Sequence, residues 1–312
     1  MLHVLSGANE RHFLGKRPGL ASVQSTHDIV NILSVDVEEY FHPTEVQPFV
    51  NGSAWSSLPS RVEPQTRALL ELFARHRVRG TFFVVGWVAE RHPGLLRAIV
   101  DGGHEIGCHS YAHSLVFDLS PREFRQDTER CVKAIVDACG VCPRSYRAPT
   151  YSITRNSIWA LEILAELGFT HDSSIYPIVH DRYGIPGFPR HAHSIDTPAG
   201  PIYEVPIATA KLGNGRITPV GGGAYLRLFP YRYTAAGIRR MNRKEGRPAC
   251  VYMHPWEIDP DQPRLAEGPI AWARTYLGLR GMMRKLDRLL TEFRFSSLAD
   301  VYPVERTQTV TA

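Results

Sequence analysis

The sequence predicts an α/β fold in which short buried strands alternate with amphipathic helices. Apolar runs of strand length recur, most clearly at residues 32–37, 80–86 and 248–254. The stretches between them carry apolar residues at helical spacing, often begin with proline and often end at glycine. Such alternation is typical of parallel βαβ units, and the number of repeats favours a closed or nearly closed barrel over an open sheet. At 312 residues and 43% hydrophobic content, the chain is long enough for one large globular domain or two ordinary ones.

The first expected strand, residues 32–37, is suited to burial on both faces. A helix should begin at Pro64 and a second buried strand should cover residues 80–86. A further helix should begin at Pro93 and end at the glycine pair 102–103. A short strand would then lead to residue 108.

The middle of the chain repeats the pattern. Residues 120–123 form a capping box with proline at the first helical position, and the helix they open should end at Gly140. A short strand follows at residues 143–147, then a helix over 154–168 and a strand over 169–174. These elements extend the predicted parallel sheet.

Residues 175–230 interrupt the alternation because glycine and proline are dense there. We interpret this stretch as an insertion of loops and short antiparallel strands, with one strand at 202–207. Long irregular segments of this kind usually form a lid or wall of a binding site. The alternation then resumes with a helix over 231–243, a strand over 248–254, a helix over 271–290 and a last strand at 293–295.

These elements predict three parts: an arm at residues 1–27, one barrel domain at 28–302 that includes a 175–245 insertion, and a tail at 303–312. No apolar run reaches membrane-spanning length, and the arm lacks the apolar core of a secretory signal. We therefore expect a cytoplasmic protein, with peripheral attachment at the inner membrane left open. The net charge of +5 is mostly dispersed, which gives no reason to expect a nucleic-acid partner.

Polar residues with catalytic chemistry follow the ends of successive predicted strands. Each has an ordinary structural explanation when taken alone, such as a helix cap, a surface ion pair or a satisfied core histidine. In a parallel barrel, however, the carboxyl ends of all strands open on one face, so we expect the set to converge there. The set is Asp36 and Glu38, His109 and His113, Arg147, Asp172, and His254.

The residue types indicate metal-assisted hydrolysis. His109 and His113 are four residues apart, so one helical turn would place both beside one ion. Two histidines and a carboxylate suit zinc or another divalent cation, which activates water and polarises a carbonyl. A second carboxylate can accept the proton of the water, and a histidine opposite can protonate a leaving amine. The expected activity is hydrolysis of an amide or ester.

Five ordered motifs carry a resemblance to a known family. They are residues 34–38, 109–113, 147–151, 172–174 and 253–255, supported by 80–83 and 103–107. At these positions the chain resembles the polysaccharide deacetylases, the carbohydrate esterases that share the NodB homology domain. More closely, residues 36–42, 182–187 and 254–260 resemble the subfamily encoded in exopolysaccharide and exosortase loci.

The resemblance implies a distorted (β/α)7 barrel and a divalent metal, most often Zn²⁺, with Co²⁺ or Ni²⁺ as further options. It implies Asp36 as general base paired with Arg147, and His254 as general acid paired with Asp172. His109 and His113 would bind the metal. Tyr151 and Trp256 are the expected substrate contacts.

One position departs from the family pattern, in which two adjacent aspartates supply the base and the third ligand. Residue 37 is valine, and the next carboxylate is Glu38, to which we assign ligation. If Glu38 cannot reach the metal, Asp36 would ligate instead and the base assignment would fail.

The predicted function is metal-dependent N-deacetylation of an amino sugar in a bacterial polysaccharide or its precursor, within exopolysaccharide biosynthesis. Two alternatives stay open. One is a cyclic amide hydrolase resembling allantoinase. The other is a catalytically inactive glycan-binding domain in an export complex.

Overall fold

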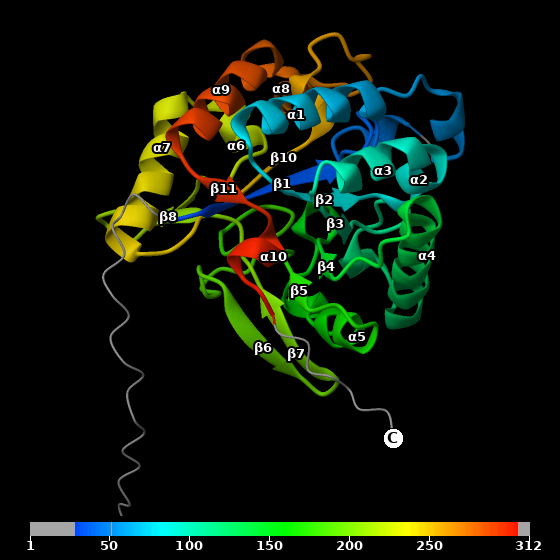
Figure 1. The fold of residues 1–312 in the computed structure, drawn as a ribbon, viewed down its shortest axis with the longest axis horizontal. Helices are drawn as coiled ribbons and strands as arrows, with labels where there is room; N and C mark the ends of the chain where they lie inside the picture. The colour runs from blue at the N-terminus through cyan, green and yellow to red at the C-terminus, as the bar shows by residue number, and fades with distance from the viewer. Residues whose placement is uncertain (1–28, 51, 305–312) are drawn as a thin grey trace, which may run out of the picture.

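The computed structural model describes residues 29–50 and 52–304, and the predicted arm and most of the predicted tail lie outside them. One curved sheet organises the chain, and seven of its strands run parallel in the order β10-β1-β2-β3-β4-β5-β7 (Figure 1). Their bounds are β1 Asn31–Val37, β2 Thr81–Val84, β3 Glu105–Cys108, β4 Ser145–Tyr146, β5 His171–Asp172, β7 Gly200–Glu204 and β10 Cys250–Met253. Two further strands extend it: β6 (His193–Thr197) pairs antiparallel with β7, and β11 (Phe295–Ser296) pairs with β1.

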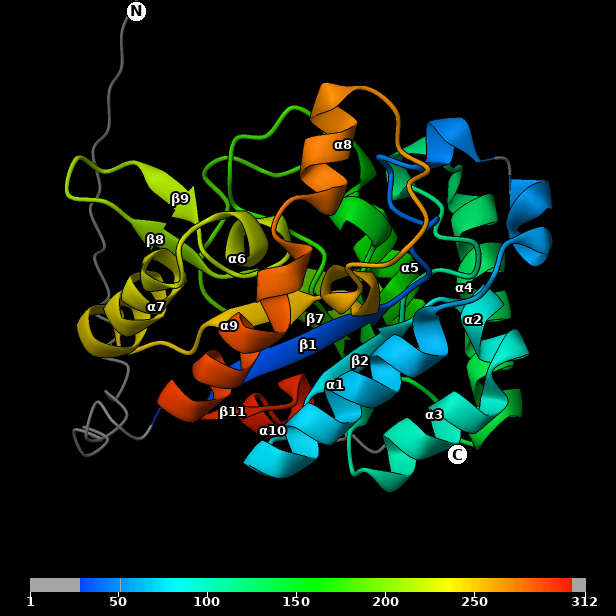
Figure 2. The ribbon, with the colours of Figure 1, turned by 90° about the horizontal axis from the view of Figure 1, so that it is seen from above.

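Helices cover the outside of the sheet, where Figures 1 and 2 show α9, α1, α3, α4 and α5 following one another around its curve. The longer helices are α1 Val62–His76, α3 Pro93–Asp101, α4 Pro121–Cys139, α7 Tyr231–Arg240, α8 Pro269–Tyr276 and α9 Leu279–Glu292. The shorter ones are α2 Gly86–Arg91, α5 Ala160–Glu166, α6 Ala224–Leu228 and α10 Leu298–Val301. None of the helices in the described residues is long and apolar enough to cross a membrane.

Local sequence signals explain most of these elements. All seven residues of β1 and all four of β2 are buried, as expected for strands covered on both faces. Helix α4 begins with the predicted capping box, in which Ser120 and Glu123 bond each other's backbone N–H, and ends at Gly140 in the left-handed conformation.

The single helix expected over residues 271–290 is wrong: the structure has two helices, α8 and α9, separated at Gly278. This residue has φ +83°, and a Cβ placed on it would lie 2.6 Å from the carbonyl oxygen of Arg227. Glycine is required there by both the backbone conformation and the close approach of α6.

The expectation for residues 175–230 is right in part. A second, small sheet of β8 (Thr209–Lys211) and β9 (Ile217–Pro219) is antiparallel, as expected. Strand β7, however, pairs parallel with β5 and belongs to the main sheet. The region expected as an insertion therefore supplies a barrel strand.

An irregular segment, not a strand pair, closes the barrel between β7 and β10. Ala208 N–H donates to the carbonyl of Cys250, and Tyr252 N–H donates to the carbonyl of Gly221. Gly222 adopts φ +115°, and a Cβ there would lie 2.0 Å from the Tyr252 carbonyl oxygen. The glycines at 221–223 therefore serve close packing against β10.

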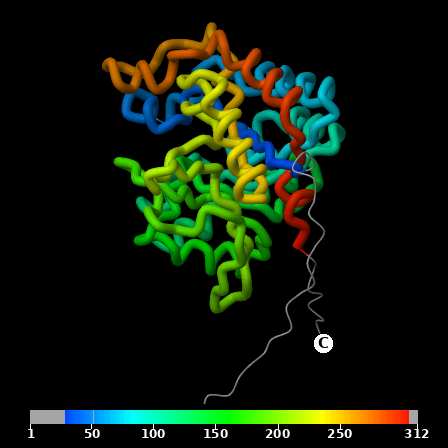
Figure 3. Tube along the Cα trace, turned by 90° about the vertical axis from the view of Figure 1, so that its left-hand side faces the viewer, coloured from blue at the N-terminus to red at the C-terminus, as the bar shows by residue number. Residues whose placement is uncertain are grey.

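The two ends of the described chain lie together, as Figure 3 shows for its blue and red segments. Strand β11 pairs with the start of β1, and Asn31 N–H donates to the carbonyl of Arg294. This arrangement leaves the carboxyl ends of the parallel strands free to form a site at the other end of the barrel.

Candidate active site

A cavity of about 550 Å³ opens at the carboxyl ends of the barrel strands. Five of the predicted residues line it: Asp36, Glu38, His109, His113 and His254. The predicted substrate contacts Tyr151 and Trp256 line it as well. Of the predicted site residues, Arg147 and Asp172 lie behind the wall, both fully buried.

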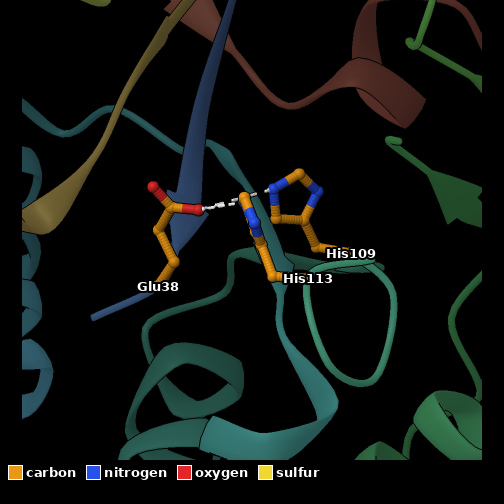
Figure 4. A group of neighbouring side chains, drawn as sticks. All are labelled: Glu38, His109 and His113. Atoms are coloured by element: carbon orange, nitrogen blue, oxygen red, sulfur yellow. Dashed lines mark ion pairs between the residues drawn. The ribbon is translucent and has the colours of Figure 1, made fainter. Parts of the chain in front are cut away.

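Glu38, His109 and His113 form a group of potential metal ligands, because one ligand atom from each lies within 4.8 Å of the others. Glu38 Oε2 is 2.6 Å from His113 Nε2 and 3.9 Å from His109 Nε2 (Figure 4). Within the described residues, no donor is aligned to hydrogen bond with this buried carboxylate oxygen. An unsatisfied carboxylate oxygen facing two imidazole nitrogens fits a divalent cation.

The two histidines do not share a helical turn, contrary to our expectation. They lie on a loop after β3 in which Ser110 has φ +62° and His113 has φ +54°. Asp127 accepts hydrogen bonds from the backbone N–H groups of Tyr111 and Ala112 and so holds this loop in place. Left-handed backbone at non-glycine residues is costly and concentrates at functional sites.

Neighbouring groups orient both imidazoles. His109 Nδ1 lies 2.7 Å from the carbonyl oxygen of Arg147, which places a proton on Nδ1 and leaves Nε2 bare for a cation. His113 stacks on the buried ring of His42 and has the Gln47 side-chain amide 3.2 Å from its Nδ1. Neither His42 nor Gln47 was singled out by the sequence.

Burial and neighbouring charges shift the pKa values of the potential metal ligands. Burial would raise the pKa of Glu38, but His113 and His254 hold it well below its usual range. Burial lowers the pKa of His109 to about 4. An ionised carboxylate beside a neutral His109 imidazole is the protonation state that a metal site requires.

The expected ion pair between Arg147 and Asp36 is present. Arg147 Nη1 donates to Asp36 Oδ1 at 2.8 Å, and the guanidinium also donates to the side chain of Ser34 and to Ser173. Burial would lower the pKa of Arg147, but Asp36 raises it above its usual value. Asp36 is therefore held beside a permanent cation, with Oδ2 3.8 Å from His254 Nε2.

The expected pair of His254 with Asp172 is wrong. Instead, Glu257 Oε2 lies 3.1 Å from His254 Nδ1, and Glu257 Oε1 accepts a hydrogen bond from Arg227. Burial would lower the pKa of His254, but Glu38, Glu257 and Asp36 raise it to about 9. His254 is therefore cationic near neutral pH, with Nε2 toward the cavity.

Asp172 belongs to another buried pair. Its carboxylate accepts a hydrogen bond from the Ser174 hydroxyl at 2.5 Å and interacts with the side chain of Glu204. Burial, and then the nearby Asp172, raise the pKa of Glu204 well above its usual range. Burial also raises the pKa of Asp172, so both carboxyl groups of the pair resist ionisation. This pair supports the strand ends next to Arg147.

Aromatic side chains form one wall of the cavity. Tyr151 packs edge-to-face against Tyr252, and its buried hydroxyl has no partner among the described residues. Trp256 stacks on His254 with ring centroids 4.9 Å apart and donates from Nε1 to Glu38 Oε1 at 2.8 Å. Trp256 thus contacts both the metal-ligand group and the histidine opposite.

Sequence reasoning missed Glu257 and Arg227. A signal for Glu257 was present, because residues 254–257 read as a capping box in which the fourth residue turns back to the first. Arg227 is 30 residues away and comes from α6. Its charge alone could not distinguish it from the chain's many surface arginines.

Two family models match the sequence of this chain. Residues 55–171 match the family described as polysaccharide deacetylase. The chain carries a polysaccharide deacetylase domain. Residues 173–303 match a second family, described as a domain of unknown function, DUF3473. The two histidines of the ligand group lie in the deacetylase match, whereas His254 and Glu257 lie in the DUF3473 match.

Two curated relatives have related sequences over part of their length. A peptidoglycan-N-acetylglucosamine deacetylase from Bacillus cereus is 31% identical over 98 residues, covering 31% of this chain and 36% of that protein. A chitooligosaccharide deacetylase from a Bradyrhizobium strain is 34% identical over 107 residues, covering 34% of this chain and 48% of that protein. The chain spans less than half the length of these curated relatives.

Solved structures share the fold. A Mycobacterium smegmatis protein assigned as a polysaccharide deacetylase superposes with a TM-score of 0.57 and 18% identity, covering 88% of this chain and 90% of that one. The allantoinase PuuE superposes with a TM-score of 0.59 and 16% identity, covering 92% and 93%. At these identities the likeness concerns the fold alone, which is the expected deformed (β/α)7 barrel.

Proposed function

We propose that this protein is a metal-dependent N-deacetylase that removes acetyl groups from amino sugars of a bacterial polysaccharide or its lipid-linked precursor. The observation that carries the proposal is the convergence, in one cavity, of a carboxylate with two histidines, an Asp36–Arg147 pair and a cationic His254. Each part supplies one requirement of amide hydrolysis.

Glu38, His109 and His113 would hold the metal, with Zn²⁺ as the expected ion and Co²⁺ or Ni²⁺ as alternatives. A divalent cation there supplies a Lewis acid that activates water and polarises the acetyl carbonyl. Asp36 is not needed as a ligand, because Glu38 reaches both histidines. Asp36 therefore remains available to accept the proton of the attacking water.

His254 would donate a proton to the departing amine. Its Nε2 lies 3.8 Å from Asp36 Oδ2 and 3.7 Å from Glu38 Oε1, so the acid stands beside the base and the ligand group. A positioned acid matters for amides because an unprotonated amine leaves poorly. Arg147 would hold the Asp36 carboxylate in position for its role as base through their hydrogen bond.

The substrate class follows from the cavity and the relatives. Aromatic walls such as Tyr151, Tyr252 and Trp256 suit the apolar faces of sugar rings. The curated relatives act on N-acetylglucosamine of peptidoglycan and on chitooligosaccharides, as their names state. An N-acetylated hexosamine polymer is therefore the proposed substrate.

The biological setting belongs to the same proposal. The motifs at residues 36–42, 182–187 and 254–260 support a role in exopolysaccharide biosynthesis, in the cytoplasm or at the inner membrane beside an export complex. Comparing the acetyl content of the exopolysaccharide from cells with and without an active-site variant would test this role.

The decisive experiment measures metal and acetate in the same preparation. We expect close to one equivalent of divalent metal per chain and metal-dependent acetate release from N-acetylglucosamine oligomers. Bound metal below about a tenth of an equivalent, with no gain on adding zinc or cobalt, would contradict the mechanism.

Opening of allantoin without acetate release would favour the cyclic amide hydrolase. Glycan binding without turnover of either substrate would favour the inactive binding domain. The three candidate functions therefore give different results in one set of assays.

A further inference from the structure

We infer that Glu257 and Arg227 form a positioning pair for His254, so that the DUF3473 region builds the acid half of the active site. The inference rests on the proposed function, because it assigns a role to residues behind the proposed general acid. Residues 173–303 match a family described only as a domain of unknown function. His254, Glu257, Arg227 and Trp256 all lie within that match.

Glu257 contacts His254 at two points. Glu257 Oε2 accepts from His254 backbone N–H at 3.2 Å and lies 3.1 Å from His254 Nδ1. A carboxylate can only accept, so Nδ1 carries the proton and Nε2 is turned toward the cavity. The stacked ring of Trp256 and the edge contact with Tyr252 limit rotation of the imidazole further.

Arg227 holds the other end of Glu257. Its Nε donates to Glu257 Oε1 at 3.0 Å, while its two terminal nitrogens donate to the backbone carbonyls of Arg274 and Leu277. Both side chains of the pair have no exposed surface. The carbonyls belong to the end of α8 and the residue after it, so the C-terminal helices fix the guanidinium.

This pair occupies the role that the family resemblance implied for Asp172. Asp172 is engaged with Ser174 and Glu204. Glu257 therefore replaces it from a different strand end, only three residues after the histidine that it positions. The support of the acid therefore lies inside the DUF3473 match, whereas Asp172 lies between the two family matches.

A positioning role predicts selectivity for the leaving group. Hydrolysis of an N-acetyl amide needs a proton delivered to the amine, whereas 4-nitrophenolate leaves from its acetate ester without one. Both reactions use the same ligands and the same base. Loss of His254 positioning should therefore slow amide hydrolysis and spare ester hydrolysis, while a general defect of the site should slow both.

The test variant is Glu257→Gln, compared with Asp172→Asn. The glutamine side chain has one acceptor oxygen and one NH₂ donor. It therefore cannot accept hydrogen bonds from both His254 and Arg227. We expect kcat on N-acetylglucosamine oligomers to fall about 10- to 100-fold, part of the 10²–10⁴ that general acid catalysis supplies. KM, metal content and the rate on 4-nitrophenyl acetate should change less than about twofold. Asp172→Asn should show no such leaving-group selectivity.

A second measurement does not depend on activity. Long-range ¹H–¹⁵N NMR of the histidine rings should show a protonated His254 Nδ1 that is protected from exchange in the wild type and lost in Glu257→Gln. If Glu257→Gln does not fold, the charge-free pair Glu257→Leu with Arg227→Met takes its place in both measurements. Equal losses on amide and ester, or an unchanged Nδ1 signal, would overturn the inference.

Failure of the proposed function would look different. A wild-type protein that releases no acetate from any amino sugar contradicts the deacetylase, yet the Nδ1 signal still decides whether Glu257 positions His254. Wild-type acetate release with an unselective Glu257→Gln variant contradicts the positioning pair alone.

Discussion

Trp256 donates a hydrogen bond from Nε1 to Glu38 Oε1 at 2.8 Å, and this contact determines which oxygen of Glu38 faces the two histidines. The other oxygen, Oε2, lies 2.6 Å from His113 Nε2. The glutamate is one carbon longer than the aspartate of the usual family motif and has one more rotatable bond. Trp256 compensates for this freedom by fixing the carboxylate in a single orientation.

Removing that hydrogen bond should weaken metal binding. Trp256→Phe keeps the stacking on His254 but leaves Glu38 Oε1 without its donor. Partners that orient metal ligands typically affect affinity by about 10- to 100-fold, and we expect a loss in that range. Titration against a chelator of known affinity measures it.

The matched control for this prediction is Trp272→Phe. Trp272 is 44% exposed on α8 and does not line the cavity. Its replacement should leave metal affinity unchanged. An equal effect of both tryptophan variants would mean that Trp256 acts through general stability and not through Glu38.

Asp36 in β1 and Glu38 just after it should have different roles, Asp36 as the base and Glu38 as a metal ligand. Glu38→Gln should weaken metal affinity by more than about 100-fold, because it alters a ligand itself and not a partner that orients one. Asp36→Asn should keep its metal and lose about 10²- to 10⁴-fold in kcat, the range of general base catalysis. Elemental analysis and acetate release on the same samples distinguish the two, and the reverse pattern would show that Asp36 is the ligand.

Much of the fold could be predicted from residue patterns. The buried runs at β1 and β2 and the capping box of α4 are local signals that survive in the structure. The break at Gly278 was missed because its cause is not local: the carbonyl of Arg227 approaches from α6. The parallel pairing of β7 was missed for the same reason, since its partner β5 is set by tertiary packing.

The candidate site could likewise be predicted only in part from the sequence. Residues at strand ends converge because parallel strands all place their carboxyl ends on one face, so Asp36, His109 and His254 could be grouped in advance. Which carboxylate supports His254 depends on side-chain reach, and three residues of spacing in a turn bring Glu257 closer than Asp172. Sequence order could not decide between them.

The Arg147–Asp36 pair should be important for stability as well as for catalysis. Arg147→Met removes the guanidinium that donates a hydrogen bond to the Asp36 carboxylate, which is 2% exposed. Breaking one side of a buried ion pair costs about 3–5 kcal/mol, and we expect the free energy of unfolding to fall by that amount. The double variant Asp36→Asn with Arg147→Met should recover part of the loss in chemical denaturation, because it leaves no uncompensated charge.

The Asp172–Glu204 pair should make stability depend on pH. The pKa of Glu204 is raised in the folded protein, so the native state holds its proton above the usual value of 4.5. The contribution of Glu204 to stability is fully present below about pH 4.5, the usual pKa of an unfolded glutamate. It declines as the pH rises toward the folded pKa, because the unfolded chain ionises there and the buried group does not. Glu204→Gln should remove this decline, because an amide does not titrate.

Urea denaturation of Glu204→Gln and wild type between pH 4.5 and 8 measures the difference. The unfolding free energy of the variant minus that of the wild type should become more positive as pH rises, since only the wild type has a carboxyl to ionise there. The exposed Glu267→Gln serves as a control and should follow the wild-type profile. A difference that stays constant or falls with pH would show that Glu204 is ionised in the folded protein.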